Sequence, residues 1–174
     1  MKFVLVFALF FCCTLFAQGQ SDYTTSLITQ DVLTGINQQV EKEIPAFKKS
    51  ISALGFSNDQ IEFAIDTFRI EHIASKRMNI DYTTFGMNIT MEQQTNSYDK
   101  LMNKYYGKLM KALKPEDKKV LITAEQSWMA YRDAENNLIN MMTKDEYSGG
   151  GSIQTNIRMS AYQDLVIKRT IAIF

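Results

Sequence analysis

One stripe of side chains constrains the fold of this chain more than any other feature. Between residues 121 and 142, apolar side chains recur at spacings of 3, 4, 3, 4, 3 and 4, and only Glu135 interrupts them. Such spacing places every member on one side of an α-helix, so it predicts a helix that packs against a partner helix. The members are Leu121, Ala124, Trp128, Tyr131, Glu135, Leu138 and Met142.

Most of the remaining chain shows the same helical spacing, and no segment alternates convincingly with a period of two. Capping boxes at Ser57–Gln60 and Thr90–Gln93 predict helix starts, whereas the irregular residues 79–89 predict a loop. We therefore expect an all-α protein of about five helices packed as one antiparallel bundle. The expected helices cover about 31–54, 57 onward, 90–113, 115–147 and 153–173.

Proline and glycine predict where these helices bend or end. Pro45 lies inside the first helical segment and predicts a kink or a break. Pro115 suits the first turn of a helix, Gly149 suits the left-handed position after a helix end, and Ser152 can cap the next helix. The run from Gly149 to Gly151 is thus expected to be a turn between antiparallel helices, or else a loop that a partner contacts.

The first residues predict export. Lys2 precedes the apolar run Phe3–Phe16, and Ala17-Gln18-Gly19 is a small-x-small cleavage site, so residues 1–19 are interpreted as a signal peptide. The run is too short to span a membrane, and no later segment is apolar enough. Residues 20–174 are then expected to form a single helical domain that works in the periplasm or outside the cell.

Both cysteines, Cys12 and Cys13, fall inside the predicted signal peptide. The bulky residues ahead of them argue against a lipoprotein tethered at either one. The exported chain would therefore contain no cysteine, and its core would have to stabilise it without a disulfide.

Composition argues against several function classes. Basic and acidic residues balance at 19 each, which disfavours nucleic acid and anionic membrane surfaces as partners. The single histidine, His72, lies on an apolar stripe, and we interpret it as a satisfied, partly buried side chain. Motifs for serine triads, metal sites or phosphate loops are absent from the sequence, so we expect no catalytic residue, no metal and no cofactor.

The segment around Trp128 combines aromatic and charged side chains. Trp128 and Tyr131 belong to the apolar stripe and are expected to be buried against the partner helix. Burial of each aromatic ring removes a large apolar surface from water. Glu135 would be costly there unless it is paired. We expect Arg132 to pair with Glu135 along the helix, and Arg169 of the last helix to meet Asp133 or Glu135.

These residues also carry a family resemblance. Three blocks occur in order: the motif from Leu121 to Glu135, the run Gly150-Gly151-Ser152-Ile153-Gln154, and Arg169-Thr170. Together they resemble the lysozyme inhibitor LprI-like family over about residues 90–173, whereas residues 20–89 resemble nothing known to us. The matching residues, interpreted as structural, are Leu121, Ala124, Gln126, Trp128, Tyr131, Arg132, Asp133, Glu135, Gly150, Gly151, Ser152 and Arg169.

The resemblance implies a disulfide that this chain lacks. Relatives usually carry one cysteine after the Arg-Asp-Ala-Glu block, where this chain has Asn136, and a second near Ala161. Because both are missing together, packing must hold the last two helices without a crosslink, which typically contributes about 2–4 kcal/mol.

The resemblance implies binding to a protein partner, with lysozyme as the named one, rather than catalysis. Candidate partner contacts gather in one acidic segment: Asp145, Glu146, Tyr147 and Gly149. One alternative is a structural or envelope-stress protein with a different partner. Another is a cell-wall enzyme that uses the plentiful carboxylates.

Overall fold

The computed structural model describes residues 28–174, which form six helices and no strands. The all-α prediction is confirmed, and the five expected helices are present together with one short additional helix. The predicted signal peptide and both cysteines lie outside the described residues. The helices are α1 (Gln30–Ser52), α2 (Asn58–Ile80), α3 (Thr84–Ala112), α4 (Pro115–Met142), α5 (Asp145–Ser148) and α6 (Ile153–Ile173).

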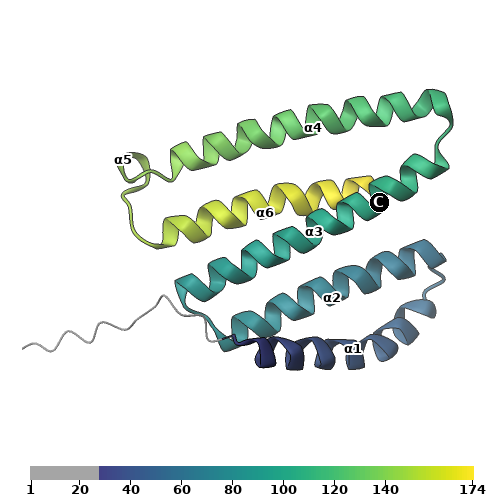
Figure 1. Ribbon diagram of the computed structural model, residues 1–174, viewed down its shortest axis with the longest axis horizontal. Helices are drawn as coiled ribbons and strands as arrows, with labels where there is room; N and C mark the ends of the chain where they lie inside the picture. The colour runs from purple at the N-terminus through teal and green to yellow at the C-terminus, as the bar shows by residue number, and fades with distance from the viewer. Residues whose placement is uncertain (1–27) are drawn as a thin grey trace, which may run out of the picture.

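Helix α3 is the centre of the molecule (Figure 1). The α1–α2 hairpin packs along one side of it and α6 along the other, with α4 beyond α6. Consecutive long helices run antiparallel, but α3 and α6 run parallel, which the sequence did not predict. The parallel register repeats every seven residues, since Gln163 donates to the Met91 carbonyl and Thr170 to the Tyr98 carbonyl.

The main core lies between α3 and α6. Its buried members are Tyr98, Leu101, Met102, Tyr105, Val166 and Ile173. Near the C-terminus, Phe174 stacks on Phe63 of α2 at 4.1 Å between ring centroids, and both rings meet Tyr105 edge-on at 5.1 Å. Aromatic contacts of this geometry join three helices into one core.

The turn between α2 and α3 corrects two predictions. Residues 79–89 are not a loop, because α2 continues to Ile80 and α3 begins at Thr84. Thr83 caps α3 by accepting from the Gly86 main-chain N–H, and the buried Asp81 carboxylate accepts from Thr83. The capping box predicted at Thr90–Gln93 is wrong, since Thr90 lies buried inside α3.

Gly86 makes this short turn possible. A Cβ atom placed on Gly86 would lie 2.1 Å from the Asp81 carboxyl carbon. Only glycine therefore lets the Asp81 carboxylate approach the first turn of α3, where it secures the chain reversal. The signal that suggested a loop, a glycine among β-branched residues, is instead a packing requirement.

The other helix ends follow the sequence in part. The Ser57–Gln60 capping box is confirmed, and α1 continues through Pro45 while it curves in Figure 1. Helix α4 ends at Met142, earlier than predicted, and Gly149 takes the left-handed position after α5 with φ 77°. Ser152 precedes α6 but makes no capping bond, because its own dihedral angles are helical.

Candidate functional site

Helix α4 carries the family signature, yet none of its residues is buried. The prediction that the apolar stripe of residues 121–142 faces a partner helix is only half correct. Trp128 and Leu121 are half-buried against the core, whereas Tyr131 is 52% exposed, Leu138 is 44% exposed, and Ala124 and Met142 also face solvent. The residues that face inward are Leu121, Glu125, Trp128, Arg132, Glu135, Asn136 and Ile139.

The error has a geometric cause. Leu121, Trp128 and Glu135 are seven residues apart and belong to both stripes. One stripe continues through apolar Tyr131 and Leu138, and the other through charged Arg132 and polar Asn136. Apolar spacing favours the first stripe. The second stripe contains Glu125, which forms an ion pair with Arg169 of α6, and this pair decides which side of α4 turns inward.

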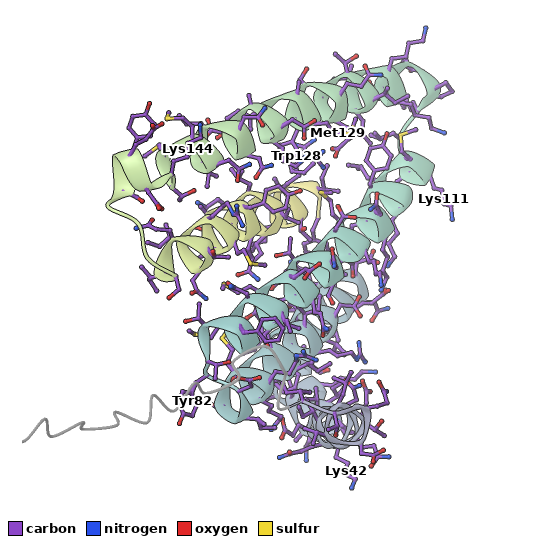
Figure 2. The ribbon with its side chains drawn as sticks, turned by 60° about the vertical axis from the view of Figure 1, so that its left-hand side comes forward. Lys42, Tyr82, Lys111, Trp128, Met129 and Lys144 are labelled. Atoms are coloured by element: carbon purple, nitrogen blue, oxygen red, sulfur yellow. The ribbon has the colours of Figure 1, made fainter. Side chains whose placement is uncertain are left out.

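An ion pair and an aromatic ring clamp α4 to α6. Both Nε and Nη2 of Arg169 donate to Glu125 Oε2, at 3.1 and 2.6 Å, and both side chains are 17% exposed. The Trp128 ring lies beneath two guanidinium groups, 5.6 Å from that of Arg169 and 5.3 Å from that of Arg132. Cation–π contacts of this kind stabilise a partly desolvated pair. Figure 2 shows Trp128 midway along α4.

The expected charge partners were wrong. Arg169 does not meet Asp133 or Glu135, because α6 runs antiparallel to α4 and its end lies opposite the first half of α4. Arg132 pairs with the adjacent Asp133 at 2.8 Å rather than with Glu135, and this hydrogen bond raises the pKa of Arg132. Glu135 makes no ion pair among the described residues and remains partly exposed to water.

A small cavity lies at Asn136, where the resemblance implies one of the two cysteines of a disulfide. Asn136 lines a space of about 240 Å³ between α3, α4 and α6, together with Asn140 of α4 and Met159 and Tyr162 of α6. Ala161, the expected second cysteine position, is partly buried on α6 beside this cavity's Tyr162. The two helices therefore meet loosely here, and the clamp at Glu125 and Arg169 lies farther along them.

The four predicted partner contacts lie together in one exposed turn, which we call the tip (residues 143–152). Asp145, Glu146, Tyr147 and Gly149 are all exposed, with Tyr147 at 64%. The tip lies at the α5 end of the α4–α6 hairpin, where Figure 2 labels Lys144. Exposed Met142 and Ile153 border it.

The glycine run gives the tip its shape. Gly149, Gly150 and Gly151 all have positive φ, at 77°, 78° and 95°, which other residues rarely adopt. The Ser148 hydroxyl accepts from the Gly150 N–H, and the Gln154 side chain donates weakly to main-chain carbonyls of the turn, at 3.5 Å. The motif residues Gly150, Gly151 and Gln154 thus shape this turn together with Ser148, which lies outside the motif.

The single histidine lies between side chains that contact it from two helices. His72 is partly exposed, contacts Glu43 at 3.2 Å through Nδ1 and stacks on Phe68, as expected for a satisfied side chain. Between residues 28 and 174, His, Cys, Asp and Glu form no group of three that could hold a metal ion. Over the same range, no helix combines the length and the apolar character needed to cross a membrane.

Comparison with known proteins supports the resemblance noted in the sequence. A family model described as "Lysozyme inhibitor LprI" matches residues 74–172, which is more than half of the chain. The match begins within α2, upstream of the resemblance at residues 90–173, and covers α3 to α6 almost completely. Neither the comparison with curated proteins nor that with solved structures gave a match.

Proposed function

Because the chain belongs to the lysozyme inhibitor LprI family, we propose that it is an exported, non-catalytic protein that binds a lysozyme in the cell envelope and inhibits it. The family match carries this proposal. The exposed tip of the α4–α6 hairpin supports it, since a projecting turn on a helical scaffold is suited to reach into the substrate cleft of an enzyme.

The tip offers a mixed acidic and apolar surface. Asp145 and Glu146 precede Tyr147, and Met142 and Ile153 add exposed apolar side chains. Host lysozymes are strongly basic, so acidic groups here would assist encounter, and tyrosine is a frequent anchor in interfaces. The clamp residues Glu125, Trp128 and Arg169 act in this scheme by holding the hairpin that presents the tip.

A lysis assay tests the proposal directly. Purified residues 20–174 are added to a lysozyme acting on bacterial cell walls, and lysis should fall at a near-stoichiometric ratio. Absence of inhibition across several lysozyme types would instead favour the alternative of another envelope partner. Release of cell-wall fragments by the protein alone would contradict the non-catalytic proposal.

Variants locate the contact surface. Tyr147→Ala is expected to weaken inhibition by about tenfold or more, as for a central aromatic anchor. Tyr82→Ala is the matched control, because Tyr82 is a similarly exposed tyrosine in the α2–α3 turn, also labelled in Figure 2. Equal inhibition by both variants would place the contact elsewhere on the molecule.

A further inference from the structure

A cleft on the other side of α3 from α4 has no role in the proposed inhibition. It encloses about 430 Å³ between α1, α2 and α3, a volume within the range of small-molecule sites. We call it the α1–α3 cleft. Ile70, Ile73, Ala74 and Leu101 give it an apolar floor.

The polar lining of the cleft is mostly cationic. Arg69, Arg77, Lys100 and Lys104 line it, against one carboxylate, Asp66. Asp66 pairs with both Arg69 and Lys104, at 3.2 and 2.5 Å. Lys100 is exposed and makes no ion pair among the residues that the structure describes. Arg69 also pairs with Glu41 at 2.5 Å, and Lys104 with Glu62 at 2.6 Å, both carboxylates lying just outside the lining. The positive charge left for a ligand is therefore that of Lys100 and Arg77, which make no ion pair among the described residues.

Arg77 is the most constrained of these cations. Its side chain is 3% exposed, and its Nε makes only a long hydrogen bond, 3.4 Å, to Thr90 Oγ1. Burial lowers the pKa of Arg77 more than the nearby Asp81 carboxylate raises it. A buried guanidinium in this situation is stabilised by a further anion, and the cleft is where such an anion would approach it.

We propose that the α1–α3 cleft binds a small amphiphile with one anionic head group and a short apolar tail. The head group lies between Arg77 and Lys100, where charge-assisted hydrogen bonds are available. The tail covers the floor of Ile70, Ile73 and Leu101, whose apolar surface leaves water on binding. This site is separate from the tip, because the cleft lies between α1, α2 and α3, whereas the tip joins α4 to α6 on the other side of α3.

Calorimetry and NMR titration with matched probes test the chemistry. Octanoate should bind one-to-one and shift the amide resonances of Ile73, Ala74 and Ser97. Octylamine should not bind, and both octanol and acetate should bind about tenfold more weakly or worse, because each lacks one half of the recognised ligand. Equal binding of octanoate and octylamine would overturn the proposal.

A separate experiment uses anionic phospholipid vesicles, because a membrane lipid also carries an anionic head group and an apolar tail. We expect no co-sedimentation with vesicles in the presence of saturating octanoate. Binding to vesicles without any binding of free octanoate would overturn the assignment to a small free ligand.

Two variants with matched controls locate the site. Ser97→Trp should fill the cleft and abolish octanoate binding, and Lys100→Gln should weaken it about tenfold. Ser160→Trp on α6 and Lys42→Gln on α1 make the same changes at exposed positions outside the lining and should bind as the parent protein does. Thermal melts confirm that each variant is folded. If the controls lose binding as the cleft variants do, the proposal is wrong.

Discussion

Helices α2 and α6 pack along the same central helix in different ways. The α2–α3 contact is lined at its surface by ion pairs, in which Lys104 bridges Glu62 and Asp66, and Lys108 bridges Asp59 and Glu62. The α3–α6 contact is buried, and its polar side chains, Gln163 and Thr170, donate to main-chain carbonyls of α3. Helix α4 has neither arrangement. It is held by the clamp to α6 and by the half-buried Leu121 and Trp128.

The comparison shows that the residues that identify the family and the residues that stabilise the fold lie mostly on different helices. The main buried cluster belongs to α3 and α6, at side chains such as Tyr105 and Val166. The residues that identify the family lie mainly on α4, which buries no side chain completely. We infer that α4 and the tip can open without unfolding the α3–α6 core, because local stability follows buried contacts.

The largest expected effect comes from the buried core. Leu101→Ala should lower the free energy of unfolding by about 2–4 kcal/mol, since it leaves a cavity between α3 and its neighbours. Leu138→Ala, on the exposed stripe of α4, should change it by less than about 0.5 kcal/mol. Urea denaturation compares them, and equal losses would mean that α4 is packed as tightly as α3.

The α2–α3 turn should be nearly as sensitive. Gly86→Ala forces the buried Asp81 carboxylate to move and should cost about 1–3 kcal/mol. Gly107→Ala is the matched control in the same helix, because nothing lies within 4 Å of its added Cβ, and it should be neutral or slightly stabilising. A stable Gly86→Ala protein would show that the turn does not need the close approach.

The clamp is tested by a double-mutant cycle. Glu125→Gln and Arg169→Met, measured singly and together by thermal melts, should show a coupling of about 1–2 kcal/mol, because the pair is largely shielded from water. The control cycle replaces Glu125→Gln by Glu135→Gln and should be additive. Coupling in the control cycle alone would restore the pairing first expected from the sequence.

The ion pairs between α2 and α3 should have the smallest effect and depend on pH. Hydrogen bonds from Lys104 and Lys108 lower the pKa of Glu62 from 4.5 to about 2. The stabilisation is therefore complete above pH 4.5 and disappears as the pH falls towards 2. Because these side chains are exposed, Glu62→Gln should cost at most about 1 kcal/mol at pH 6.

Urea denaturation of parent and Glu62→Gln proteins at pH 6 and pH 2 measures this difference. The two proteins should converge in stability at pH 2. Glu92→Gln removes an exposed carboxylate of α3 that makes no ion pair among the described residues, so its effect should not change with pH. A constant effect of Glu62→Gln across the same range would mean that the lysines do not stabilise the ionised carboxylate.

Local signals in the sequence predicted most of the architecture. The helical spacing, the capping box at Ser57 and the left-handed Gly149 depend on neighbouring residues alone, and the structure confirms them. The α2–α3 turn was missed, because Gly86 is required by Asp81, whose carboxylate reaches it only after the chain has reversed. The parallel register of α3 and α6 likewise depends on contacts 72 residues apart.

The site was predictable to a lesser extent. Asp145, Glu146, Tyr147 and Gly149 were expected to contact a partner. The structure places all four at exposed positions of the tip, and their contact with a partner stays a proposal. The orientation of α4 was missed, because two stripes share Leu121, Trp128 and Glu135. An antiparallel register alone would have placed Arg169 near Glu125, so this pair was within reach of the sequence.

Native-state hydrogen exchange tests the central claim, that α4 is held to the core by a clamp and a few half-buried side chains rather than by fully buried ones. Exchange rates of α4 amides are compared with those of α3 under increasing but sub-denaturing urea. We predict that α4 amides exchange through a local opening of lower free energy than global unfolding, and that Glu125→Gln lowers this energy further. If α4 and α3 amides exchange with the same free energy and the same urea dependence, α4 is an integral part of the core and the claim is wrong.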